Sequence, residues 1–325
     1  MADRTLDEQL VKYLTDMHSI EEQALQQLRK APDIAGDPAL ARAFEEHLRE
    51  TERHEELVRE RLEAHGANAS AVKDLVMRAG GAGFLLFARL QPDTPGKLAA
   101  HAYSYEHLEL AAYELLGHVA TRAGDEATAD LARRIGVEEQ AMAERLAGLW
   151  DTAADASLRD VGRDDLPEQL TKYLADAHAI EAQAIQLLER APSIVSDSTV
   201  AAIFEDHLAE TRDQQDLVDE RLRALGGSPS RLKDAAMRLG ALNWGTFFRS
   251  HPDTPGKLVA FAYAFEHLEI GGYEQLKRVA QRAGDGETVT LADRILAQER
   301  EVAHRLAGAF ERAAEASLEA VGVSP

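Results

Sequence analysis

The sequence contains no cysteine, which restricts the chemistry available to the protein. Disulfides, thiolate zinc sites, iron–sulfur clusters and thiol catalysis are excluded, so any bound metal must be held by oxygen and imidazole ligands. Positive charge is also scarce, because 36 Lys and Arg stand against 57 Asp and Glu, a net charge of −21 over 325 residues. This balance argues against nucleic acid or an anionic membrane surface as a partner, since both attract clustered basic residues.

Long apolar runs are missing as well. No run approaches the ~18 residues that a membrane span needs, and the N-terminus lacks a basic segment followed by an apolar one. We therefore expect no signal peptide, no membrane span and a cytoplasmic location. Runs of β-branched residues and alternating patterns are scarce too, which disfavours a β-sheet. Apolar residues make up 45% of the chain, enough for a core in each of two domains.

An internal repeat divides the chain. The segment beginning at Leu10 recurs from Leu170, and the segment beginning at Pro92 recurs from Pro252, so matching residues are 160 apart. A period this long indicates a duplicated domain rather than a solenoid. We expect two domains of one architecture, residues 3–158 (copy 1) and 163–321 (copy 2), packed against each other as an intrachain pseudo-dimer.

Within each copy the hydrophobic pattern is helical. In copy 1, apolar residues at three- and four-residue spacing predict four long helices, starting near Leu10, Asp37, Thr94 and Asp125. Between the second and third lie about 30 less regular residues, with a short helical piece at residues 72–77 and a glycine-rich bend at residues 80–83. Two short connections and one long one predict an all-α fold, a ferritin-like four-helix bundle with a long crossover between helices two and three.

Each long helix carries glutamate at a position where the three- and four-residue spacing predicts an apolar residue. With a rise of ~1.5 Å per residue, these positions reach similar heights in the bundle. Four carboxylates cannot remain ionised together in an apolar interior, whereas two divalent cations would balance them. The candidate metal ligands are Glu21, Glu50, Glu106, Glu109 and Glu139 in copy 1, and Glu181, Glu210, Glu266, Glu269 and Glu299 in copy 2.

Histidine is supplied irregularly. His54 follows Glu50 by four residues and is a further candidate ligand, but Gln214 replaces it in copy 2. Among the histidines that recur in both copies, we expect two pairs to hydrogen-bond ligands or carbonyls rather than to bind metal; they are His47/His207 and His107/His267. Carboxylate and imidazole ligands suit iron, with manganese or zinc as alternatives, at two ions per bundle at most.

Four motifs resemble the YciE/YciF group of ferritin-like proteins across both copies. They are Tyr-Leu-x-Asp-x-x-x-x-Glu-x-Gln from Tyr13, Ala-Phe-x-x-His-Leu-x-Glu-Thr from Ala43, Glu-His-x-Glu-x-x-x-Tyr from Glu106, and the pair Glu138-Glu139. The resemblance implies a ferritin-like bundle with a dinuclear, iron-binding centre and a link to stress response. Glu106-x-x-Glu109 is also similar to the helix-three glutamates of rubrerythrins. The chain departs from the group at Ala143 and Ala303, where the group often has Asp.

We therefore hypothesise a dinuclear metal centre in which Glu50 and Glu139 bridge, Glu21 and Glu106 are terminal ligands, and His54 and Glu109 complete the set. If catalytic, the protein would be a diiron or dimanganese oxidoreductase that acts on O₂ or peroxide. One alternative is a non-enzymatic stress or scaffold protein with degenerate sites, whose glutamates pair with arginine. Another is an iron-storage cage.

Overall fold

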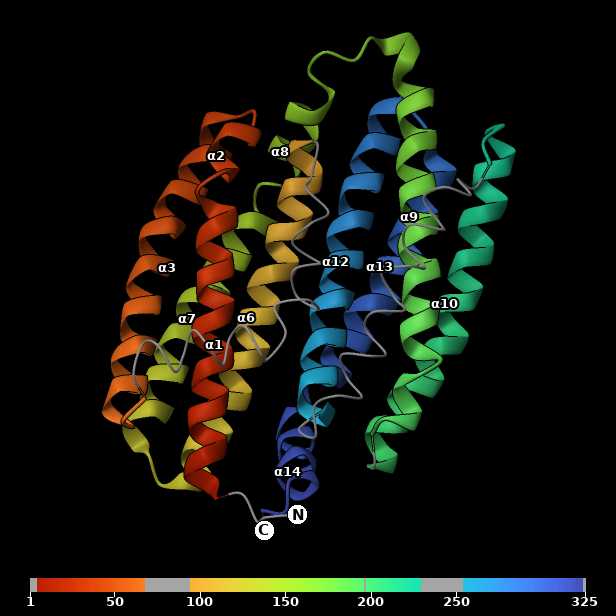
Figure 1. Cartoon of the computed structure of the whole chain (residues 1–325). Coiled ribbons are helices and arrows are strands. Elements are labelled where there is room, and N and C mark those ends of the chain that lie inside the picture. Colours follow the sequence, from red (N-terminus) through yellow and green to blue (C-terminus); the bar gives the residue numbers. More distant parts are fainter. Residues whose placement is uncertain (1–4, 68–93, 196, 229–253, 324–325) are drawn as a thin grey trace.

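The computed structural model describes residues 5–67, 94–195, 197–228 and 254–323 (Figure 1). Copy 1 comprises α1 (Leu6–Leu28), α2 (Ala31–Ile34), α3 (Pro38–Ala64), α6 (Pro95–Ala123), α7 (Glu126–Ala147) and α8 (Trp150–Leu158). Copy 2 comprises η1 (Arg163–Asp165), α9 (Leu166–Leu188), η2 (Ala191–Ser193), α10 (Ser198–Ala224), α12 (Thr254–Ala283), α13 (Gly286–Ala307) and α14 (Phe310–Ala320). These ranges contain no β-strand, which confirms the all-α prediction. No helix within them is both long and apolar enough to cross a bilayer.

The helices begin where the sequence carries capping residues. The Thr5 side chain caps α1 and forms a reciprocal capping box with Glu8. Asp37 caps α3 with Pro at the first helical position, and Thr94 caps α6 in the same way. Gly124 ends α6 in a left-handed conformation (φ 71°), which glycine adopts without steric cost. The predicted starts of helices two, three and four therefore agree with the structure to within a residue.

In each copy four long helices form a bundle. In copy 1, α1 contacts α3 and α6, and α7 contacts the same two helices. Gly36, before α3, lies against Pro95 at the start of α6, while Arg61 near the end of α3 pairs with Asp125 beyond the end of α6. Helices α3 and α6 therefore run parallel, the arrangement of helices two and three in ferritin-like topology. The predicted helical piece at residues 72–77 and bend at 80–83 fall outside the described residues.

In each copy a fifth helix follows the four long helices that the sequence predicts. In copy 1, α7 ends at Ala147, the chain turns, and α8 begins at Trp150. This turn buries Trp150, whose ring packs edge-on against Tyr103 of α6 at 5.1 Å. In copy 2, Phe310 begins α14 and packs in the same way on Tyr263 of α12. Packing of one aromatic ring per copy, buried Trp150 and partly buried Phe310, accounts for the break in each helix.

The two bundles pack through α6 and α12, which lie side by side in the middle of the molecule and run in opposite directions (Figure 1). The Ser104 hydroxyl donates to the carbonyl of its repeat equivalent Ala264 at 2.6 Å, which marks a pseudo-twofold axis. A Cβ atom on Gly271 would come within 2.9 Å of the Ala100 backbone, so glycine permits this close approach. The structure thus supports the expected intrachain pseudo-dimer.

Two equivalent histidines meet on this axis. The rings of His107 and His267 stack with centroids 3.4 Å apart, between Tyr103 and Tyr263. Each Nδ1–H donates to a tyrosine carbonyl one turn earlier at 2.7 Å. Burial lowers the pKa of His107 to about 4, and burial together with the neighbouring His107 ring lowers that of His267 well below its usual value. Both rings are therefore neutral packing groups at neutral pH.

Candidate metal centre

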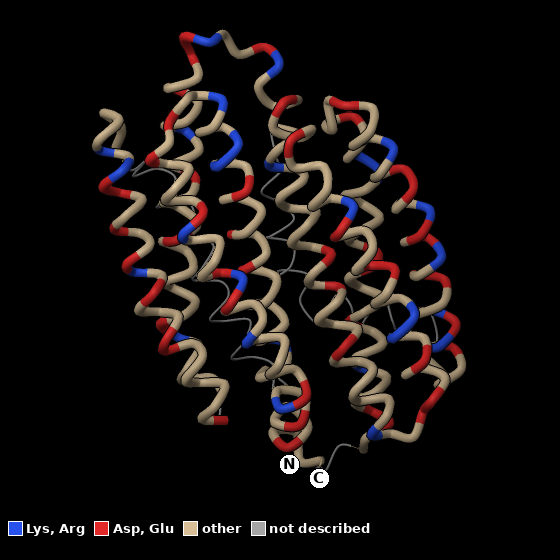
Figure 2. The backbone as a smooth tube through the Cα atoms, turned by 180° about the vertical axis from the view of Figure 1, so that it is seen from behind, with Lys and Arg blue, Asp and Glu red and all other residues tan. Residues whose placement is uncertain are grey.

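Two kinds of acidic residue occur in this chain. Asp and Glu are spread over the helices of both bundles, interspersed with Lys and Arg (Figure 2). Four glutamates of copy 1 instead lie in the bundle interior, each at most 3% exposed; they are Glu21, Glu106, Glu109 and Glu139. They come from α1, α6 and α7, because each occupies a position on the stripe that its helix turns toward the core.

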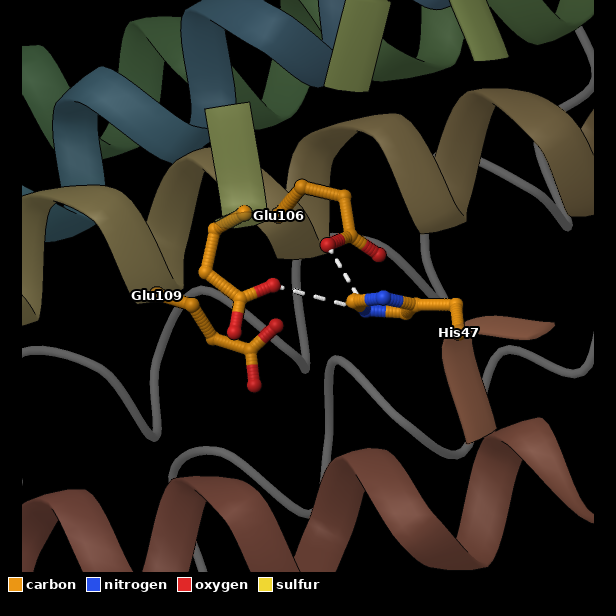
Figure 3. A group of neighbouring side chains, drawn as sticks. His47, Glu106 and Glu109 are labelled. Carbon is orange, nitrogen blue, oxygen red and sulfur yellow. Dashed lines mark ion pairs between the residues drawn. The ribbon is translucent and has the colours of Figure 1, made fainter. Parts of the chain in front are cut away.

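The first group of converging side chains is centred on His47 of α3. Its Nε2 lies 3.0 Å from Glu106 Oε2 and 3.4 Å from Glu139 Oε2. Glu106 and Glu109, three residues apart on one face of α6, project toward the imidazole (Figure 3). One ligand atom from each of these four residues lies within 4.8 Å of the others, a spacing suited to holding one metal ion.

A second group shares Glu139 with the first. It consists of Glu21, His54 and Glu139, again with ligand atoms within 4.8 Å of one another. The Nδ1 of His54 lies 2.7 Å from Glu139 Oε1, whereas Oε2 of the same carboxylate faces His47. Glu139 is therefore placed between the two groups with one oxygen toward each. The Tyr113 hydroxyl donates a hydrogen bond to Glu21 and holds that carboxylate in place.

In each of the two histidines, a carboxylate contacts the ring nitrogen that faces away from the converging ligand atoms. The Nδ1 of His47 lies 3.1 Å from Glu50, so its Nε2 is left to face the interior. The Nε2 of His54 lies 2.8 Å from Glu138, so its Nδ1 faces the interior. Metal-binding histidines are commonly held by carboxylates in this way. Glu50, which the sequence suggested as a bridging ligand, is partly exposed and lies behind His47 rather than among the converging atoms.

Burial and mutual repulsion perturb the protonation of these groups. Burial, reinforced by Glu139, raises the pKa of Glu21 to about 8, and burial raises that of Glu109 well above its usual value. Burial also raises the pKa of Glu106 to about 7 against the opposing attraction of His47. Burial disfavours the His54 cation, but contacts with Glu139 and Glu21 outweigh it and raise the pKa to about 9. The site thus holds protons in place of a cation.

The fit of a metal ion to these residues is tested most directly by Glu109. Its side chain is buried, yet neither carboxylate oxygen has a hydrogen-bond partner among the residues that the structure describes. The same holds for its equivalent in copy 2, Glu269. An unsatisfied buried polar group costs about 1–3 kcal/mol, and more when charged. A divalent cation between oxygen and imidazole donors would remove this cost, so the residues fit a metal ion.

Copy 2 reproduces one of the two groups. His207, Glu266, Glu269 and Glu299 converge within 4.8 Å, and His207 Nε2 lies 2.9 Å from Glu266 Oε2. Tyr273 donates to Glu181 as Tyr113 does to Glu21. Glu210 lies 3.6 Å from His207 Nδ1, at the position that Glu50 takes in copy 1. Glu181 does not belong to a converging histidine–carboxylate group within the described part of copy 2.

The structure brings together most of the candidate ligands but changes the part played by His47 and His207. From the sequence we expected these two histidines to hydrogen-bond ligands or carbonyls, and in the structure their Nε2 atoms face the buried glutamates directly. A signal for this was present in the repeat, since His47 is retained in copy 2 and His54 is not. The i, i+3 spacing from His47 to Glu50 also matches a ligand and the carboxylate that orients it.

Comparison with known proteins agrees with this architecture. The chain matches the family described as "Domain of unknown function (DUF892)" twice, over residues 5–159 and 165–319. No solved structure gave a significant match. Because the two matches cover nearly the whole chain, the protein belongs to the DUF892 family, within the ferritin-like superfamily, and carries two tandem copies of its domain.

Proposed function

We propose that this protein binds divalent metal ions inside each bundle, iron first, with manganese or zinc as alternatives. The observation that carries the proposal is the buried group His47, Glu106, Glu109 and Glu139, in which both oxygens of Glu109 lack a partner within the described ranges. Its counterpart around His207 supports it independently.

In copy 1 the same proposal assigns two adjacent ions. His47, Glu106, Glu109 and Glu139 would hold one, and Glu21, His54 and Glu139 the other. Bound ferrous ions would supply electrons for the reduction of O₂ or peroxide, an oxidoreductase activity in keeping with the link to stress response that the resemblance to the YciE/YciF group implies.

The surrounding residues of the chain prepare this site. Glu50 and Glu138 keep the two imidazoles turned inward, and Tyr113 anchors Glu21. Burial keeps bulk water away from Glu106 and Glu109. Glu138 is 40% exposed on its side chain, so the contact from His54 Nε2 to Glu138 offers displaced protons a route from the interior to solvent.

The alternative of a non-enzymatic protein with degenerate sites predicts glutamates paired with arginine. Within the described residues, however, the ion pairs of Glu106 and Glu139 are with His47 and His54. Histidine in contact with several carboxylates is typical of metal ligation rather than of a structural ion pair. This observation favours metal binding over the scaffold hypothesis.

Elemental analysis of the purified full chain tests the proposal. We expect stoichiometric Fe, Mn or Zn in the wild-type protein and less metal in Glu109→Ala and Glu139→Ala. Glu56→Gln, an exposed position on α3, serves as the control and should retain the wild-type content. Absence of these metals after growth and reconstitution with each ion, or binding that survives both alanine substitutions, would overturn the proposal.

A further inference from the structure

The two copies differ where copy 1 holds its second group of ligands. His54 contacts Glu139 through Nδ1 and Glu138 through Nε2. In copy 2 the equivalents of His54 and Glu138 are Gln214 and Gln298, so both members of this pair are neutral amides. The two changes lie at positions that contact each other in both copies.

Gln214 also uses the oxygen that a second ion would need. Its amide Nε2 donates to Glu299 Oε1 at 2.5 Å and lies 3.4 Å from Gln298 Oε1. In copy 1 the corresponding oxygen of Glu139 faces the Nδ1 of His54. An amide nitrogen has no lone pair to offer a metal, whereas a neutral imidazole nitrogen does. In copy 2, therefore, an N–H donor stands where copy 1 presents a ligand.

Loss of Glu138 removes the carboxylate that orients the missing ligand. A histidine that binds metal depends on the group behind it for its orientation and basicity. Gln298 carries no charge. Copy 2 therefore lacks both a histidine at position 214 and the carboxylate that would orient it. The other group of copy 2, around His207, keeps all four members buried.

We infer that the chain binds three divalent ions, two in copy 1 and one in copy 2. The inference rests on the proposed function and adds to it the distribution of ions between the copies. Copy 2 becomes a single-ion site formed by His207, Glu266, Glu269 and Glu299. Chemistry that requires two adjacent ions is then confined to copy 1.

Reciprocal double variants of the full chain test this distribution. Gln214→His with Gln298→Glu rebuilds the missing pair in copy 2, and His54→Gln with Glu138→Gln converts copy 1 to the arrangement of copy 2. We would load each protein with Zn²⁺, remove excess ion, and measure bound zinc by elemental analysis and native mass spectrometry. The expected values are three ions for the wild type, four for the first variant and two for the second. Glu56→Gln removes one negative charge, as the second variant does, and as its control should bind three.

The wild-type count keeps the inference falsifiable even if a variant does not fold. Four or two ions in the wild-type chain, or three in a folded Gln214→His/Gln298→Glu variant, would overturn the distribution while leaving metal binding intact. No bound ion at all would overturn the proposed function itself. With Mn²⁺, electron paramagnetic resonance should show one exchange-coupled pair and one isolated ion per chain. Two coupled pairs, or isolated ions alone, would contradict the inference.

Discussion

The two bundles share their helix order and a buried group of one histidine and three glutamates, but they balance the charge of a shared carboxylate differently. Burial opposes ionisation of Glu139, yet contacts with His54 and His47 outweigh it and lower the pKa. Burial raises the pKa of Glu299 well above its usual value, since Gln214 provides no cation. Replacement of His54 by Gln214 thus removes one of the two imidazole contacts that favour ionisation of this carboxylate.

The same fold thus accommodates two different sets of contacts around the equivalent buried carboxylates Glu139 and Glu299. Copy 1 places imidazole on both sides of its carboxylate, an arrangement that two cations can replace. Copy 2 satisfies one side with an amide N–H and leaves the other side, near His207, for an ion. The backbone needs no change, because His and Gln occupy the same helical position and differ mainly in charge and in lone pairs.

The largest contrast between the copies should appear in metal-dependent stability. Each ion bound at one hundred times its dissociation constant stabilises the folded state by about 2.7 kcal/mol. Glu139→Ala should remove the contribution of two ions and Glu299→Ala that of one, as measured by thermal unfolding with saturating Zn²⁺ and with chelator. Equal losses of metal-dependent stability in the two variants would contradict a difference in ion number between the copies.

In the metal-free protein, substitution of Glu139 or Glu299 by the isosteric Gln should change the free energy of unfolding by different amounts. At neutral pH, Glu139→Gln removes the buried anion that both His54 and His47 contact, and breaking a buried ion pair costs about 3–5 kcal/mol. Burial raises the pKa of Glu299 and so disfavours its charge, and Glu299→Gln should therefore change stability by less than about 1 kcal/mol. Urea unfolding in the presence of chelator measures both. A larger loss for Glu299→Gln would reverse the assignment of charge.

Both copies contain buried groups with a raised pKa, so the free energy of unfolding of the metal-free protein should depend on pH. The pKa is raised to about 8 for Glu21 and Glu181 and to about 9 for His54, so the folded state holds more protons than the unfolded state above pH 6.5. The free energy of unfolding should fall as pH rises from 6.5 to 8, by about 1.4 kcal/mol per pH unit for each extra proton. Denaturant titrations at several pH values with chelator would show this slope, and a rise in stability over this range would contradict it.

The contact between the bundles gives the smallest expected effect. Gly271→Ala places a Cβ 2.9 Å from the Ala100 backbone and should cost about 1–3 kcal/mol by forcing α6 and α12 apart. Gly272→Ala is a matched control, since its Cβ would meet Ile180 at 3.7 Å, an ordinary contact, and should stabilise the helix by up to about 1 kcal/mol. Thermal unfolding compares the two, and equal effects would show that the axis is not closely packed.

Much of the fold could be predicted because its signals are local. Caps such as Asp37 and Thr94 and the three- and four-residue spacing of apolar residues locate the helices within the segment that carries them. The break before Trp150 was not predicted, because its cause is the Tyr103 ring on another helix. The glutamates of the site stood out since each interrupts an apolar stripe. His47 did not, because its orientation depends on Glu50 and on the depth at which α3 packs.

By itself, the sequence determined the duplication, the all-helical class, the exclusion of thiol ligands and most of the inward-facing glutamates, although it also included the partly exposed Glu50 and Glu210. Each of these follows from residue identity and periodicity along one segment. Only the tertiary structure decided which nitrogen of each histidine faces inward and that Glu139 lies between two groups of candidate ligands. It also decided that Gln214 donates a hydrogen bond to Glu299 in copy 2. These features depend on distances between atoms of different helices, which periodicity along a single helix does not specify.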